Sequence, residues 1–166
     1  LLSYKEIIKK INGTNKIIFI NNKLIKGLIN NTQLNFNLAY GRLDFEGKLD
    51  IAGGEIFCKG DGQLTEDYPR LFFDCKFDIS EQNKIFRKFS LKDKVTNENF
   101  VLDILGDLNL FNGKINFKVI RTDKNYNASA ADKKFIKNSF EKILFDDGFF
   151  NIFKFEKIKN FLNDII

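Results

Sequence analysis

Histidine, methionine and tryptophan are absent from this 166-residue chain, which has one proline and two cysteines. Without an imidazole there is no Ser-His or Cys-His pair and no histidine ligand for a metal. Two cysteines are too few for a cysteine-rich zinc site, and the sequence has no glycine-rich phosphate loop. Asp44 and Glu46 form a carboxylate pair, but they alternate with apolar residues as the solvated side of a strand does. The sequence therefore predicts a protein that is not an enzyme and uses no cofactor or metal.

Long apolar runs are also missing. No stretch of the sequence approaches the ~20 consecutive apolar residues of a membrane-spanning helix, so we expect no segment to cross a bilayer. The chain begins Leu1-Leu2-Ser3 and has no methionine anywhere, which indicates a fragment of a longer protein whose targeting signals lie upstream. We expect residues 1–166 to form one β-rich domain, because this length suits a single hydrophobic core.

The positive charge of the chain is dispersed. Lys and Arg number 27 against 22 Asp and Glu, for a net charge of +5, and the two signs are mixed along the sequence. This pattern favours a solvated surface over a binding face for nucleic acid or anionic headgroups. Hydrophobic residues make up 43% of the chain and charged residues 30%, which is typical of a folded domain.

Alternation of apolar and charged residues predicts long amphipathic strands. In residues 43–51, Leu, Phe, Gly, Leu and Ile alternate with Asp, Glu, Lys and Asp, as in a strand with one dry side. Gly53-Gly54 is predicted to form a two-residue turn after it. Residues 71–79 continue the same design in a further strand. With that turn the opposite pairs are Ile51 with Ile56, Leu49 with Cys58, and Gly47 with Gly60.

A second long hairpin is predicted around Asn112-Gly113, a dipeptide typical of type I′ turns. Its apolar positions are Leu102, Ile104, Leu108 and Leu110 before the turn and Ile115, Phe117 and Val119 after it.

The two hairpins resemble copies of one unit. Aligned on their turns, residues 43–59 and 102–118 share seven identities in seventeen positions, where chance gives roughly one. Gly47 and Gly106 occupy the same point of the rising strand. Two interpretations of these glycines are open. They permit a bend or bulge in a long sheet, which is the usual meaning of a strand glycine, or they leave floor space for a bound apolar ligand.

The rest of the chain completes the expected architecture. Shorter strands are expected at 17–20, 24–29 and 34–38, and another at 84–91, so that residues 16–120 form a β meander. The spacing of Ser3 and Glu6 predicts a capping box for a short helix within residues 1–12.

Two amphipathic helices are expected in residues 129–166, the first capped by Ser129 with Asp132 in its first turn. We favour the interpretation that these helices cover an open edge of the sheet. The alternative is docking to an anionic membrane surface through their lysines. These are Lys133, Lys134, Lys137, Lys142, Lys154, Lys157 and Lys159.

Cys58 and Cys75 lie on the apolar side of neighbouring strands. Directly opposite positions would allow a disulfide in an oxidising compartment. That register is one of several, so we favour two buried free thiols.

The pattern Leu-Asp-x-x-Gly-x-Leu then Gly-x-Ile, with Ser-Ala-x-Asp and Ile-Lys-x-Phe-Leu segments at the end, resembles the C-terminal part of AsmA-like proteins, which include the TamB-related intermembrane proteins. The resemblance covers residues 32–166. It implies a periplasmic antiparallel sheet curled into a groove, an inner-membrane anchor in a segment outside these residues, and a role in phospholipid transport or outer-membrane assembly.

An apolar trough is the site that this resemblance predicts, with phospholipid acyl chains and the rest of the longer chain as partners. Its expected lipid-contacting residues are Phe45, Leu49, Ile51, Ile56, Phe73, Phe77, Leu108, Ile115 and Phe117. The alternatives are a spacer with a filled core and a polyanion- or RNA-binding scaffold. The latter would use Lys84, Arg87, Lys88, Lys92 and Lys94 around Phe86 and Phe89, although strand alternation argues against it, because nucleic-acid-binding sheets expose several aromatics together.

Overall fold

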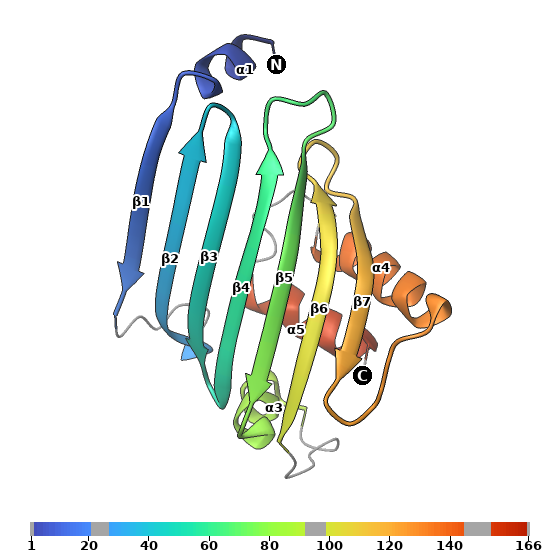
Figure 1. Ribbon diagram of the computed structural model, residues 1–166. Coiled ribbons are helices and arrows are strands. Elements are labelled where there is room, and N and C mark those ends of the chain that lie inside the picture. The colour runs from blue at the N-terminus through green and yellow to red at the C-terminus, as the bar shows by residue number, and fades with distance from the viewer. Residues whose placement is uncertain (1, 21–26, 92–98, 145–153, 166) are drawn as a thin grey trace.

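Seven antiparallel strands form one open sheet in the order of the chain (Figure 1). The computed structural model describes residues 2–20, 27–91, 99–144 and 154–165. Each strand pairs with the next, so β1 and β7 are the edges of the sheet. The predicted β meander is confirmed, whereas the groove-like curl is not. The strands are β1 Asn12–Phe19, β2 Ile29–Ala39, β3 Arg42–Ile51, β4 Gly54–Gln63, β5 Arg70–Ile79, β6 Phe100–Asn109 and β7 Ile115–Thr122.

The predicted short strands before the first hairpin are partly confirmed. Residues 17–20 overlap β1 and residues 34–38 lie within β2. Residues 24–26 of the segment predicted at 24–29 lie outside the described residues, and of residues 27–29 only Ile29 belongs to a strand, β2. The turn between β2 and β3 is Tyr40-Gly41, and both residues have positive φ, as a type I′ hairpin turn requires.

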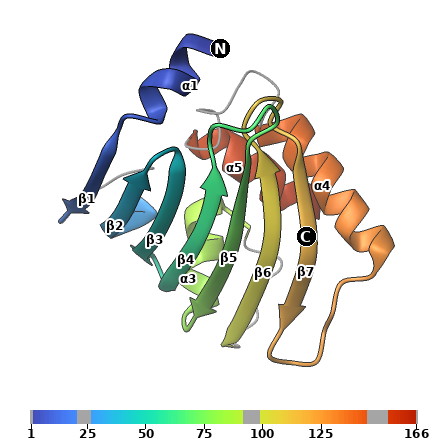
Figure 2. The same ribbon diagram turned by 45° about the horizontal axis from the view of Figure 1, so that its top comes forward.

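Four described helices accompany the sheet: α1 Leu2–Ile8, α3 Gln82–Phe89, α4 Ala130–Leu144 and α5 Phe155–Ile165. In Figures 1 and 2, α1 lies beyond the ends of β1–β3, while α4 and α5 lie against one face towards β7. The helices expected near both ends of the chain are therefore present. Because α1 begins at Leu2, Ser3 lies inside the helix and not at the predicted N-cap.

The prediction of a strand at 84–91 is wrong, because residues 82–89 form helix α3. Phe86 and Phe89 are three residues apart and would point to opposite faces of a strand. In the helix both lie on one side and are buried, which is why the helical conformation is preferred.

The N-terminus of α4 has the predicted cap. Asp132 N–H donates to Ser129 Oγ at 3.2 Å, and Ser129 N–H donates to Asp132 Oδ2 at 2.9 Å. The side chain and the backbone N–H of Ser129 lower the pKa of the Asp132 carboxyl. Tyr126 donates a hydroxyl hydrogen bond to the same carboxylate, and burial together with this negative charge raises the pKa of Tyr126.

The first hairpin has a different register from the predicted one. Ile51 pairs with Gly54, so the turn is Ala52-Gly53, with only Gly53 at positive φ, +98°. Gly54 approaches β5 closely, since a Cβ on it would lie 2.2 Å from the carbonyl oxygen of Asp78. It therefore serves as a strand residue. The observed pairs, shifted by two residues, are Leu49 with Ile56, Gly47 with Cys58, and Phe45 with Gly60.

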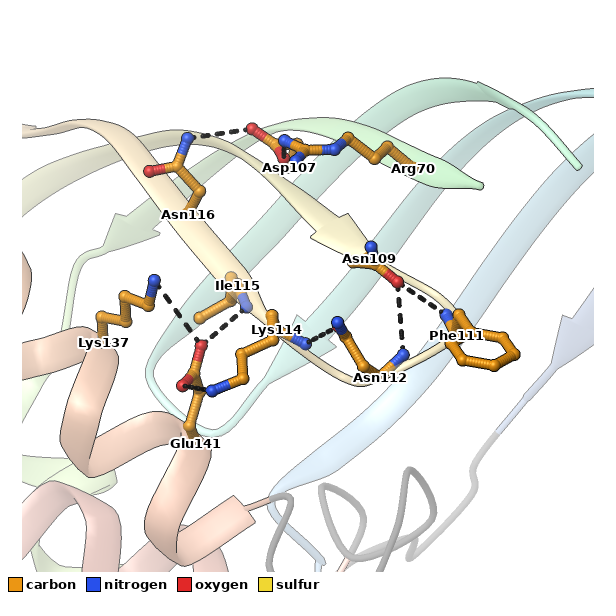
Figure 3. A network of polar contacts seen from close by, with 10 residues as sticks. All are labelled: Arg70, Asp107, Asn109, Phe111, Asn112, Lys114, Ile115, Asn116, Lys137 and Glu141. Carbon is orange, nitrogen blue, oxygen red and sulfur yellow. Dashed lines mark hydrogen bonds and ion pairs between the residues drawn. The ribbon is translucent and has the colours of Figure 1, made fainter. Parts of the chain in front are cut away.

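The second hairpin turns through four residues and not through the predicted two. Asn109 and Lys114 join at the strand ends, and the Asn109 side-chain oxygen accepts hydrogen bonds from the N–H groups of Phe111 and Asn112 (Figure 3). A local Asx-type turn thus replaces the type I′ turn.

An irregularity between Leu105 and Gly106 also changes which residues of β7 face inward. Phe117 pairs with Gly106 and Val119 pairs with Leu105, so Lys118 is the extra residue of a bulge. Beyond it Ile120, which is 5% exposed, takes the inward position predicted for Val119. The bulge interpretation therefore applies at Gly106, whereas the ladder through Gly47 is regular.

The internal repeat is present despite these differences. Both turns differ from the predicted ones, yet Leu49 pairs with Ile56 as Leu108 pairs with Ile115. The two hairpins therefore share one register from the turn as far as Gly47 and Gly106, beyond which the bulge at Lys118 shifts the second.

Candidate functional site

The nine residues predicted to line an apolar trough all lie on one face of the sheet. The ladder pairings place each of them opposite another residue of the same face from β3 to β7. Ile51 and Ile115 are buried and the other seven are half-buried. The structure thus brings the predicted residues together on a face that the described helices cover only in part.

A row of alternating phenylalanine and glycine crosses the middle of this face. Phe45, Gly60, Phe73, Gly106 and Phe117 pair in turn from β3 to β7. A Cβ on Gly60 would lie 2.5 Å from the Phe45 ring, and one on Gly106 would lie 2.7 Å from the Phe73 ring. The rings of Phe45 and Phe73 therefore pack over the glycine of the next strand, so the floor space expected at Gly106 is filled by an aromatic side chain.

Helices α4 and α5 cover the β7 side of the face. Phe140 of α4 contacts Phe117 edge-on, with ring centroids 5.9 Å apart, and Phe161 of α5 contacts Phe140 at 5.7 Å. Phe155 of α5 stacks on the buried Phe89 of α3 at 5.1 Å. Aromatic contacts therefore connect the sheet to α3, α4 and α5 over this half.

A polar contact fixes α4 beside the edge of the sheet (Figure 3). Ile115 N–H donates to the Glu141 carboxylate at 3.0 Å, and Lys114 and Lys137 lie 3.6 and 3.9 Å from the same carboxylate. Lys133 donates to the Lys118 carbonyl oxygen at 3.1 Å. Two of the α4 lysines considered for membrane docking are thus engaged by the protein itself, as the edge-covering interpretation of this helix requires.

The β2–β4 part of the apolar face is left open by the described helices. Figures 1 and 2 place α4 and α5 towards β7, with no described helix over β2 and β3. The apolar side chains on this part of the face are half-buried, except that of Ile51, which is buried. We call this surface the open half. Its residues are Leu34, Phe36, Leu38, Leu43, Phe45, Leu49 and Ile56.

The opposite face of the sheet carries cross-strand ion pairs. Lys48 lies 2.6 Å from Glu55, and the hydrogen bond and charge of that carboxylate raise the pKa of Lys48. Arg121 lies 3.0 Å from Asp103. Asp107 is buried and accepts hydrogen bonds from Arg70 at 2.7 Å and from the amide of Asn116 at 3.1 Å. One face of the sheet is therefore polar and suited to contact with water, whereas the other face is apolar.

Cys58 and Cys75 are directly opposite each other on β4 and β5 and form a disulfide. The favoured prediction of free thiols is wrong. The disulfide requires the register of β4 and β5 in which Cys58 lies directly opposite Cys75. The alternation of apolar residues does not determine this register.

The basic segment considered for RNA lacks the exposed aromatic residues that base stacking requires. Phe86 and Phe89 are the buried residues of α3, and Lys92 and Lys94 lie outside the described residues.

Within the described ranges, no group of three or more Cys, Asp or Glu side chains could hold a metal ion. The described helices are also too short or too polar to cross a membrane. We find no match to this chain among protein-family models, curated proteins or solved structures.

Proposed function

We propose that the open half of the sheet holds phospholipid acyl chains, and that the protein takes part in phospholipid transport or outer-membrane assembly without catalysing a reaction. The observation that carries this proposal is that the described helices leave part of a continuous apolar face uncovered. Seven half-buried apolar side chains on three adjacent strands, with charged residues confined to the other face, are a surface suited to an apolar ligand.

The dimensions and energetics of the open half support this role. A strand the length of β3, 10 residues, extends about 33 Å at ~3.3 Å per residue. Burial of hydrocarbon is favourable by about 0.8 kcal/mol per CH₂ group, so several methylene groups against this face suffice for binding without a headgroup motif. A finer form of the proposal is that the sheet curls into a groove around the chains.

The disulfide supports the compartment that this function needs. Bonds such as Cys58–Cys75 persist in oxidising environments, including the bacterial periplasm. Together with the resemblance to AsmA-like proteins, this favours a periplasmic domain that belongs to a longer chain with an inner-membrane anchor.

Native mass spectrometry of the chain purified from bacterial cells, followed by lipid extraction, tests the proposal. We would compare Phe36→Asp, which places a charge in the open half, with Phe72→Asp on the charged face, where Phe72 is 41% exposed. Both variants must keep the circular dichroism spectrum of the parent chain.

Phospholipid that co-purifies with the parent and with Phe72→Asp, and is lost in Phe36→Asp, would support the proposal. A folded parent chain that carries no lipid and takes up none from phosphatidylethanolamine and phosphatidylglycerol vesicles would overturn it. That result would favour a spacer whose apolar face is covered by protein.

A further inference from the structure

The two edge strands of the sheet, β1 and β7, differ in whether the rest of the chain hydrogen-bonds to their outer sides. At β7, the segment that follows the strand bonds to its outer side: Ala128 N–H donates to the Ile120 carbonyl oxygen at 2.8 Å, and Thr122 N–H donates to the Tyr126 carbonyl oxygen at 2.9 Å. The contacts from Glu141 and Lys133 of α4 use further groups of the same strand. The outer edge of β7 is therefore closed by its own chain.

The edge at β1 has no such protection among the described residues. No described strand pairs with its outer side, and α1 lies beyond its end (Figure 1). The β1–β2 ladder has no bulge, and β1 contains no proline and one charge, Lys16. Bulges, prolines and charges are the devices with which proteins usually block an edge. Instead, four consecutive apolar residues are exposed: Ile17 by 36%, Ile18 by 51%, Phe19 by 45% and Ile20 by 72%.

We propose that residues 16–20, at the apolar end of β1, pair antiparallel with the same residues of a second copy of this chain, about a two-fold axis at Ile18. Opposite residues of an antiparallel pair lie on the same face, so this register places Ile17 opposite Phe19 on the apolar side. It places each Lys16, on the charged side, opposite Ile20, the residue that follows β1. A register centred on Lys16 would set two like charges against each other, which is destabilising.

The closed edge at β7 limits this association to two copies. Pairing of one strand with its own copy is isologous, so it uses the free edge of both chains at once. No second free edge is left among the described strands from which a fibre could grow. The axis lies perpendicular to the sheet, so both apolar faces stay on the same side and form one wider surface. This inference does not rest on lipid binding.

Sedimentation velocity of the 166-residue chain over a range of concentrations tests the pairing. We expect a monomer–dimer equilibrium, and Ile18→Lys should weaken it by at least about tenfold, because two lysines would meet at the axis. Phe57→Lys is the matched control, since Phe57 is also an exposed apolar residue of the charged face but lies on the interior strand β4. It should leave the equilibrium unchanged.

A chain that stays monomeric at all concentrations would overturn the proposal, and so would open polymers or a dimer insensitive to Ile18→Lys. The register is tested by cysteine. Ile18→Cys should form an interchain disulfide under air oxidation, whereas Lys16→Cys, which faces Ile20 across the axis, should not. Cross-linking of Lys16→Cys in preference to Ile18→Cys would exclude the Ile18-centred pair.

Discussion

The hairpins β3–β4 and β6–β7 have the same register between the turn and Gly47 or Gly106 and share their leucine, glycine and isoleucine positions, but their apolar sides have different surroundings. Ile56 of the first hairpin is half-buried, whereas Ile115 at the matching position of the second is buried. Phe117 contacts α4, and Cys58 at the corresponding position is bonded to β5. A repeated local pattern therefore determines the strand pairing, while a distant part of the chain decides what is buried.

The largest expected difference between the hairpins concerns the two isoleucines. Ile115→Ala should lower the free energy of unfolding by about 3 kcal/mol, because it leaves a cavity under α4. Ile56→Ala, on the open half, should lower it by about 1 kcal/mol, because folding removes less apolar surface from water at Ile56. Urea unfolding followed by circular dichroism measures both. Equal losses would mean that the open half is as well packed as the covered half.

The disulfide stabilises the hairpin that the described helices leave open. Its cysteines are 17 residues apart, and replacing both with alanine should lower the free energy of unfolding by about 3 kcal/mol at most. Amide hydrogen exchange should show the largest increase in β4 and β5. Dithiothreitol should reproduce the effect in the parent chain and leave the double variant unchanged. Faster exchange confined to β6 and β7 would contradict this assignment.

The paired glycines should respond to alanine in different ways. Gly106→Ala should destabilise by about 2 kcal/mol, because the new methyl group would meet the Phe73 ring and the Asn116 carbonyl oxygen. At Gly47 the nearest atom is the end of the Leu34 side chain, 3.3 Å away, which can move. Gly47→Ala should therefore change stability by less than about 0.5 kcal/mol. Thermal unfolding of the two variants gives the comparison, and a loss at Gly47 equal to that at Gly106 would refute it.

Acid should loosen the cover of the second hairpin. The Asp132 carboxyl has a pKa below its unfolded value, so its contribution to α4 is complete above about pH 4 and is lost as the pH falls through the folded pKa. Hydrogen exchange of α4 should therefore rise in acid, and Asp132→Asn should remove part of that dependence. Ser129→Ala should cost about 1 kcal/mol of stability at neutral pH. An acid response unchanged in Asp132→Asn would assign it to other carboxyl groups.

The two faces of the sheet could be predicted from the sequence because side chains alternate with a period of two. An error of two residues in the first turn left every side chain on its predicted face, which is why the nine trough residues still lie together. A register error of two residues does matter for the disulfide, because the bond needs two cysteines that are directly opposite each other.

Other features depend on contacts that periodicity does not contain. In segment 84–91 the positions of Phe86 and Phe89 suit a helix, but the basic residues between the apolar ones also suit a strand. The bulge beside Gly106 reverses the alternation along β7, and no residue type marks it in advance. Which half α4 and α5 cover depends on Phe117 meeting Phe140, a contact between segments that share no local pattern.

The alternating phenylalanine and glycine row means that two of its rings are already held in place by neighbouring strands. Immobilising a free side chain on binding costs about 0.5–1.5 kcal/mol. Phe45 and Phe73 would not incur this entropy loss again when another molecule is laid against them, because Gly60 and Gly106 already accommodate their rings. The face is preorganised, so its affinity for an apolar guest depends on the hydrocarbon surface that the guest buries and little on the ordering of the rings beneath it.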